Sequence, residues 1–214
     1  MAEEEIDMLC SHMNQVSVDQ VCSLDDDNAI SCLRLTEVLD LDEALAKARA
    51  ALESCEPHHV RLRQMASAYC WLFPHNQRLE WGLFALDESL PPVDDFDLQT
   101  RIATALTFPG VDIGYVTLSS GGARYACAIT AEQQCKPQGT QIVVGMFAWQ
   151  GLPYLAISFP GKNCLTRVKP LLEGVLKCKF HDRFIGSYAG IDETLAQVNI
   201  HRMQPASDAA NMEI

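Results

Sequence analysis

The sequence lacks the features that assign a chain to most catalytic or membrane classes. No stretch approaches the roughly 18 uncharged apolar residues that a transmembrane helix needs, so we expect no membrane partner. It contains neither a GxGxxG nor a GxxxxGK[ST] phosphate-binding loop. No two of its nine cysteines have the Cys-x-x-Cys spacing of a structural zinc site. These absences predict a protein without a cofactor, a metal ion or a small-molecule substrate.

Disulfide bonds are also not expected, because the nine cysteines are odd in number and irregular in spacing. The first five residues include three glutamates, which is the reverse of the basic start of a secretory signal. Both features favour a reducing compartment, the cytosol or the nucleus.

Basic residues are scarce in the first half of the chain. Residues 1–100 carry six basic and twenty acidic side chains, a net charge of −14, whereas residues 101–214 carry ten basic and eight acidic side chains, a net charge of +2. The segment 162–183 alone has a balance of +4. Contact with a polyanion is therefore expected to begin in that segment, although ordinary lysines on a solvated helix face would give the same composition.

The first half has helical periodicity. Ser17 followed by Gln20 is a capping-box pattern that predicts a short helix. Apolar residues at three- and four-residue steps predict helices over 41–52 and over 59–73, the second ending at Pro74. Trp81 and Phe84, at i and i+3, favour a fourth helix over 78–86. Their spacing indicates the core of a helical hairpin more than an exposed aromatic platform.

A pair of prolines, Pro91 and Pro92, predicts a domain boundary, because prolines break helices and stiffen a connector. One more helix is expected over 94–106. Strand composition then predicts an antiparallel meander over 111–118, 123–130, 140–149 and 153–159, followed by a helix over 165–178, an extended segment over 180–188 and a short helix over 191–198. The expected domains are a helical one at 1–92 and an α+β one at 93–205, with a flexible tail at 206–214.

Candidate catalytic residues are few. Cys70 and His75 have the residue types of a nucleophile and its base, but Cys70 lies between Tyr69 and Trp71 in an apolar helix, where a free cysteine is usually a buried hydrophobe. His58 and His59 are adjacent and point to different faces of a helix, which makes a shared metal improbable.

Three stretches together resemble the centromere protein N family of the inner kinetochore. The first is Ala66 to Leu86, "ASAYCWLFPHNQRLEWGLFAL", which is similar to the family's helix, polar turn and Trp-x-x-Phe segment. The second is 140–159, which ends in "PYLAISF" and resembles the central hairpin. The third is 165–195, which resembles the following helix, strand and short terminal helix. The resemblance covers about residues 1–205.

The resemblance implies a fold, a location and partners. The fold would be α+β, with an amino-terminal pyrin-like helical bundle followed by an antiparallel-sheet domain like the region that centromere proteins L and N share. The location would be the nucleus, at the centromere and kinetochore. The partners would be the nucleosome that contains the histone variant CENP-A, and also centromere protein L and other inner-kinetochore subunits. The family's carboxy-terminal half, which joins centromere protein L, is not expected in these residues.

The resemblance also implies contact residues. Glu3 and Asp7 fall where the family's acidic contacts to the histone lie, with Glu4 and Glu5 as near substitutes, and the candidates are Glu3, Glu4 and Asp7. A carboxylate facing an exposed arginine forms a charge-assisted pair. Basic residues of both domains would hold DNA; the candidates are Arg78, Lys162, Arg167, Lys169, Lys177, Lys179 and Arg183.

Some of the family's basic positions have changed. Cys10, Ser11 and Gln15 replace basic residues of the first helix, and Asp40, Asp42 and Glu43 replace others at the start of the helix at 41–52. Each lost phosphate contact removes a released counterion, so DNA binding should be weaker and less dependent on salt.

Three hypotheses follow. The first is a non-enzymatic adaptor that recognises the CENP-A nucleosome and supports kinetochore assembly and chromosome segregation. The second is a kinetochore scaffold subunit without nucleosome or DNA contact, which the acidic first half would suit. The third is a cysteine enzyme, which requires a reactive, exposed thiolate.

Overall fold

The computed structural model describes residues 2–26, 29–30, 33–35, 38, 40–86, 95–107, 110–120, 123–132, 142–149, 152–159, 164–176 and 183–203. Within these ranges, the side chains of 2–5, 26, 95–98, 119–120, 123, 132, 164–167, 176 and 202–203 are not described. The described part has a mixed α+β fold with seven helices and one six-stranded antiparallel sheet. The predicted boundary at 91–92 and the predicted tail at 206–214 lie outside the described residues.

Four helices precede the first strand. They are α1 (Ala2–Met13), α2 (Val18–Asp26), α3 (Leu41–Glu53) and α4 (His58–His75). The capping box predicted for α2 is confirmed, because the Ser17 amide donates to Gln20 Oε1 over 3.0 Å and the Gln20 amide donates to Ser17 Oγ over 3.3 Å. Asp40 caps α3 by accepting from the Glu43 amide over 2.8 Å. α4 continues two residues past its predicted end and includes Pro74 in its last turn.

The predicted helix over 78–86 is wrong: β1 (Glu80–Ala85) is a strand of the sheet. Trp81 and Phe84 are both buried, but Trp81 belongs to the core on the α4 side of the sheet and Phe84 to the core on the other side. The two rings therefore occupy opposite faces, with a register irregularity after Leu83. A strand buried on both faces places apolar residues at every position, and its i, i+3 spacing imitates a helix.

The remaining elements are α5 (Asp95–Ala105), β2 (Val111–Ser120), β3 (Ala123–Glu132), β4 (Ile142–Trp149), β5 (Tyr154–Ser158), α6 (Cys164–Leu176), β6 (Phe184–Ala189) and α7 (Gly190–Met203). The predicted antiparallel meander is confirmed, since β2 to β5 are consecutive neighbours. The strand order is β2-β3-β4-β5-β1-β6, so β1 joins the sheet beside β5 and β6 forms an edge.

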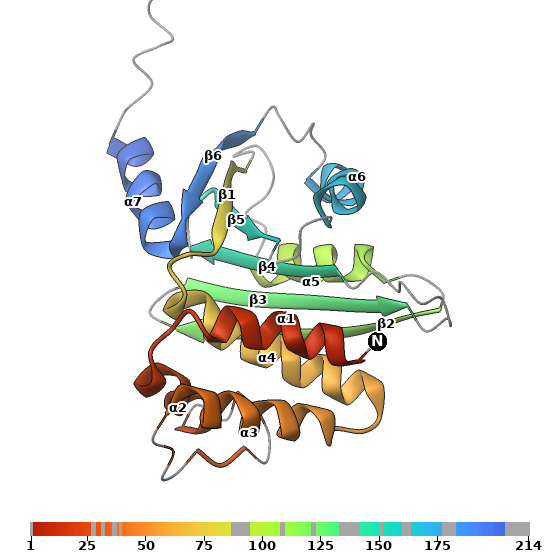
Figure 1. Cartoon of the computed structure of the whole chain (residues 1–214). Coiled ribbons are helices and arrows are strands. Elements are labelled where there is room, and N and C mark those ends of the chain that lie inside the picture. The colour runs from red at the N-terminus through yellow and green to blue at the C-terminus, as the bar shows by residue number, and fades with distance from the viewer. Residues whose placement is uncertain are drawn as a thin grey trace, which may run out of the picture.

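Helices cover both faces of the sheet. α4 packs on β2 and β3, with α1, α2 and α3 beyond it, and α7 packs beside β1 and β6 (Figure 1). α5 and α6 contribute Ile102, Ala103, Val168 and Leu172 to the core of the opposite face. Along β4 every residue is buried and alternate side chains belong to alternate cores, as the period of two in a strand requires.

The helical layer and the sheet share one core. Phe73 of α4 packs edge-on against Trp81 of β1, with ring centroids 5.1 Å apart, and its ring covers Gly145 of β4. α4 approaches β2 so closely that a Cβ at Gly114 would overlap the backbone of Leu62 and Arg63. No helix in the described ranges is both long enough and apolar enough to cross a bilayer.

Candidate functional site

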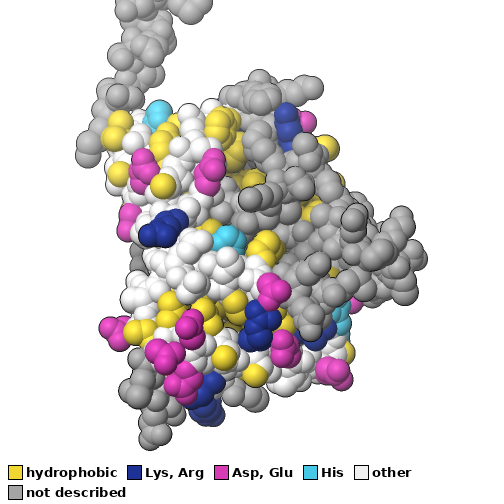
Figure 2. Space-filling model, in the orientation of Figure 1, with side chains coloured by type: hydrophobic (Ala, Val, Ile, Leu, Met, Phe, Trp, Pro, Cys, Tyr) yellow, Lys and Arg dark blue, Asp and Glu magenta, His cyan; other side chains and the backbone are white. Residues whose placement is uncertain are grey.

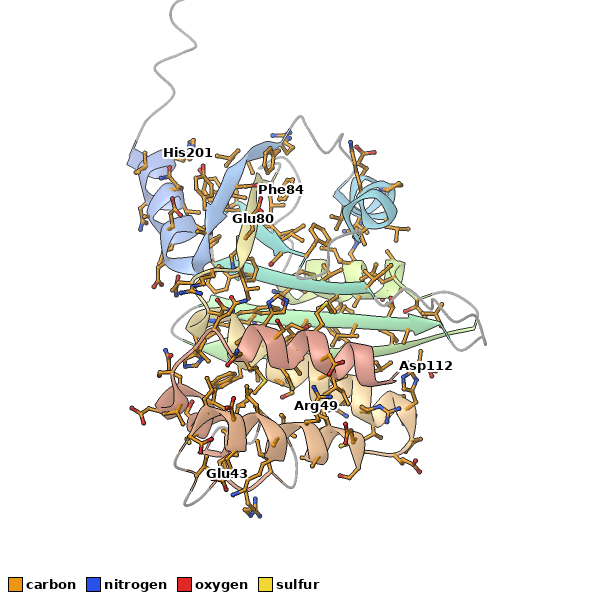
Figure 3. The ribbon with its side chains drawn as sticks, in the orientation of Figure 1. Glu43, Arg49, Glu80, Phe84, Asp112 and His201 are labelled. Carbon is orange, nitrogen blue, oxygen red and sulfur yellow. The ribbon has the colours of Figure 1, made fainter. Side chains whose placement is uncertain are left out.

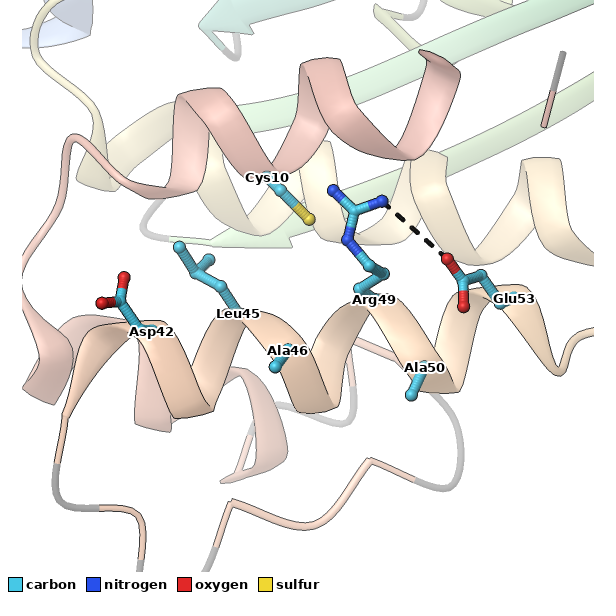
Figure 4. Close-up of a pocket in the computed structure, with 7 residues that line it drawn as sticks. All are labelled: Cys10, Asp42, Leu45, Ala46, Arg49, Ala50 and Glu53. Carbon is cyan, nitrogen blue, oxygen red and sulfur yellow. Dashed lines mark ion pairs between the residues drawn. The ribbon is translucent and has the colours of Figure 1, made fainter. Parts of the chain in front are cut away.

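The candidate site is a groove between α1 and α3, which lie side by side (Figure 3). Its α3 wall follows from helical spacing: residues three and four positions apart share a face. Asp42, Leu45, Ala46, Arg49, Ala50 and Glu53 line the groove on this wall, and Cys10 lines it from α1 (Figure 4). The groove has a volume of about 350 Å³. The small side chains of Ala46 and Ala50 keep it open on the α3 side.

Carboxylates surround the single arginine of this groove. Asp7 of α1 accepts a hydrogen bond from Arg49 Nη2, and Glu53 Oε1 lies 3.8 Å from Arg49 Nη1 (Figure 4). The hydrogen bond with Asp7 raises the pKa of Arg49 above its ordinary value, so Arg49 is a permanent cation. Asp42 lies at the other end of the groove and makes no ion pair with any described residue.

The surface around the groove carries more acid than base. Glu43 also lies on α3 and pairs with Lys47, with 2.9 Å between Oε1 and Nζ. The described side chains of α1 and α3 thus supply the carboxylates Asp7, Asp42, Glu43 and Glu53 against the cations Lys47 and Arg49. Acidic side chains gather with few basic ones over the helical layer, in the lower part of Figure 2. Two of these acids, Asp42 and Glu43, also suit the positive end of the α3 dipole.

Of the predicted histone contacts, the structure describes the side chain of Asp7 only. It is 56% exposed and lies beside the groove, already paired with Arg49. Glu3 and Glu4 lie in the first turn of α1, three to four positions before Asp7, but their side chains are outside the described residues.

The structure does not bring the described basic candidates together. Arg78 is exposed in the turn between α4 and β1, whereas Arg183 lies at the other end of the β1–β6 ladder, where its carbonyl accepts from the Ala85 amide. The strand between them separates their backbones by roughly 20 Å. Lys169 lies on α6, on the other side of the sheet. Lys162, Lys177 and Lys179, and the side chain of Arg167, are outside the described residues.

Sequence reasoning missed Arg49 and Glu53 of the groove, and it named Asp42 only as a replacement for a basic residue. Their signal was present in part, because Asp42, Leu45, Arg49 and Glu53 recur at helical spacing along α3. The sequence does not show that α1 packs against this face of α3. That packing brings Asp7 into contact with Arg49, 42 positions later in the chain.

The candidate cysteine nucleophile is enclosed. Cys70 is 1% exposed, its thiol points to the Val116 carbonyl oxygen at 3.6 Å, and burial raises its pKa far above the ordinary value. His75 Nδ1 lies 2.6 Å from the Trp71 carbonyl oxygen, and its ring stacks on that indole. Each residue of the proposed pair is thus engaged elsewhere.

One of the two candidate metal ligands, His58, is also engaged. His58 Nδ1 lies 2.9 Å from Asp112 Oδ2 and so links the start of α4 to β2. In the described ranges, no three His, Cys, Asp or Glu side chains are placed to hold one metal ion.

Comparison of the chain with models of protein families and with curated protein sequences gave no match.

Proposed function

We propose that this protein is a non-enzymatic adaptor that binds the CENP-A nucleosome at the inner kinetochore, with the α1–α3 groove as its histone-binding site. The observation that carries the proposal is the exposed carboxylate of Asp7 at a groove with further carboxylates at Asp42 and Glu53. The location, the identity of the nucleosome and the link to centromere protein L come from the sequence resemblance to centromere protein N.

The groove suits a basic side chain from a histone loop. The aliphatic part of an arginine or lysine would lie against Leu45, Ala46 and Ala50, while its charged end meets Asp42 or Asp7. Arg49 makes the same type of contact within the chain, because its guanidinium lies between Asp7 and Glu53. A histone arginine would either compete with Arg49 for Asp7 or bind Asp42, which makes no ion pair with any described residue.

DNA would contribute less than the histone in this proposal. The described basic candidates Arg78, Lys169 and Arg183 do not form one patch, so few phosphates would be neutralised at once and the dependence on salt would be shallow. The same observation favours a second candidate function, a kinetochore scaffold subunit that contacts other proteins and neither the nucleosome nor DNA.

A titration of the full chain against reconstituted CENP-A and ordinary nucleosomes tests the proposal. We expect tighter binding to the CENP-A nucleosome. Of Asp7→Asn and Asp42→Asn, the variant that removes the carboxylate paired with the histone arginine should weaken that binding by about tenfold, as expected for one charge-assisted pair of roughly 1.5 kcal/mol. Glu80→Gln is the matched control, because it removes one exposed carboxylate from β1, on the sheet and away from the groove (Figure 3).

Two results would contradict histone recognition: equal affinity for both kinds of nucleosome, or binding unchanged by the groove variants and by Glu3→Lys. Binding to neither nucleosome at low salt, together with capture of other inner-kinetochore subunits, would support the scaffold alternative.

A further inference from the structure

Strand β6 forms one edge of the described sheet. The Gly190 amide donates to the Leu79 carbonyl over 2.8 Å. This hydrogen bond shows which amides of β6 face β1. Because amides alternate in direction along a strand, those of Ser187 and Ala189 point away from β1. Ala189 confirms this direction, since its amide donates outward to Glu193 Oε2 over 2.9 Å. Ser187 is exposed, and no described strand pairs with this edge.

Exposed apolar side chains are concentrated on β6 and on the helix that follows it. The described part of the chain exposes four large hydrophobic side chains, and three of them lie on β6 and α7: Phe184 at 39%, Leu195 at 37% and Ile200 at 45%. Phe184 packs on Phe84, on the α5–α6 face of the sheet. α7 buries Ile191 and Val198 in the core of the opposite face. A strand added to β6 would therefore meet the exposed ring of Phe184 on the α5–α6 face of the sheet.

The other edge of the sheet is less available. α4 lies against β2, where Gly114 touches the helix backbone and the Val116 carbonyl accepts from Cys70. Leu118 is the one large hydrophobic side chain that is exposed there among the described residues. Open, flat edges with apolar flanks are the edges that pair with other chains.

We propose that β6 pairs with β6 of a second copy of this chain, antiparallel, about a two-fold axis at Ser187. The charged residues at the two ends of β6 favour a second copy of the chain as the partner. Arg183 precedes β6, whereas Asp192 and Glu193 follow it at the start of α7. An antiparallel two-fold pairing brings Arg183 of each copy toward Asp192 and Glu193 of the other, and symmetry forms this contact twice. In the dimer, the Glu193 carboxylate releases the Ala189 amide and pairs with Arg183 of the second copy. A parallel pairing would place like charges together.

Sedimentation of the full chain under reducing conditions, over a wide range of concentrations, tests this pairing. We expect a dimer that forms as the concentration rises. Ser187→Pro should give a monomer, because proline removes an amide that points away from β1 and leaves the ladder inside the sheet intact. Ser187→Ala is the matched control and should still dimerise, since it keeps the amide.

Reversing the charges at the ends of β6 provides a second test of the pairing. Arg183→Glu should raise the dimer Kd by about tenfold, and adding Glu193→Arg to that variant should recover most of the loss. Hydrogen exchange of the unmodified chain needs no variant: the Ser187 amide should exchange more slowly at high concentration, with no change at Gly114. The proposal would be overturned by a monomer at every concentration, or by a dimer that Ser187→Pro leaves intact. It would also be overturned by a dimer that only Leu118→Lys dissociates, or by a Ser187 amide whose exchange rate does not change with concentration.

Discussion

At the scale of single residues, Cys70 and Cys127 are ionisable groups enclosed in the core. Cys70 lies on α4 and Cys127 on β3, and both are at most 1% exposed. Burial raises the pKa of both thiols, and the proximity of Cys70 raises that of Cys127 further. Both side chains pack in the core between α4 and the sheet, and a thiol that keeps its proton is a poor nucleophile.

These thiols should make the fold sensitive to alkaline pH. In the folded state they stay protonated, whereas in the unfolded chain they ionise near pH 9, so the stability they contribute is full below that pH and falls as the pH rises above it. Between pH 7 and pH 10 the free energy of unfolding should fall by about 1 kcal/mol more in the native sequence than in Cys70→Ala. Urea unfolding of both proteins at each pH measures this difference. Equal losses in the two proteins would show that Cys70 ionises normally in the folded state.

Residue-level prediction from the sequence succeeded where the cause was local. The Ser17–Gln20 capping box depends on residues three apart, and both of its backbone hydrogen bonds are present. Asp7 was predicted as a surface contact, but its pairing with Arg49 depends on the packing of two helices. No spacing within either helix contains that information.

At the scale of elements, the contact between α4 and β2 depends on a glycine. A Cβ at Gly114 would overlap backbone atoms of Leu62 and Arg63, which cannot rotate away as a flexible side chain would. Gly114→Ala should therefore destabilise the protein by about 1–3 kcal/mol. Gly174 of α6 is the matched control, because nothing lies within 4 Å of its Cβ position. Gly174→Ala should stabilise the protein by up to about 1 kcal/mol, through helix propensity.

Thermal and urea unfolding of the two glycine variants measure these effects. A Gly114→Ala protein as stable as the native sequence would mean that α4 shifts away from β2 at little cost. A loss of stability in Gly174→Ala would contradict the open surroundings of that position.

Strands β1 and β6 are the elements whose place in the sheet could not be predicted from the sequence. The meander β2 to β5 has short connections and strand composition, so its antiparallel order could be predicted from neighbours in the sequence. β1 could not, because Trp81 and Phe84 are buried on opposite faces of a sheet whose other strands come at least 25 residues later. β6 was predicted as extended, and its place at the edge follows only from its pairing with β1.

At the scale of the whole molecule, the helical layer and the sheet are joined by β1. This strand precedes the predicted boundary at 92, yet it lies between β5 and β6. One continuous core contains Ile6 of α1, Leu52 of α3, Trp81 of β1 and Val143 of β4. A cut at 92 would remove both neighbours of β1 and expose the face of α4 that packs on β2.

We therefore expect the helical part and the sheet to unfold together. Circular dichroism at 222 nm reports mainly on the helices, whereas tryptophan fluorescence reports on Trp71 of α4, Trp81 of β1 and Trp149 of β4. The two urea transitions should coincide, because loss of the sheet exposes the apolar face of α4 and loss of α4 uncovers the sheet. A fragment of residues 1–92 should have less helix than the same residues in the full chain and should melt without a sharp transition. Two separate transitions, or a cooperative melt of that fragment, would instead establish two independent domains with the boundary at Pro91 and Pro92.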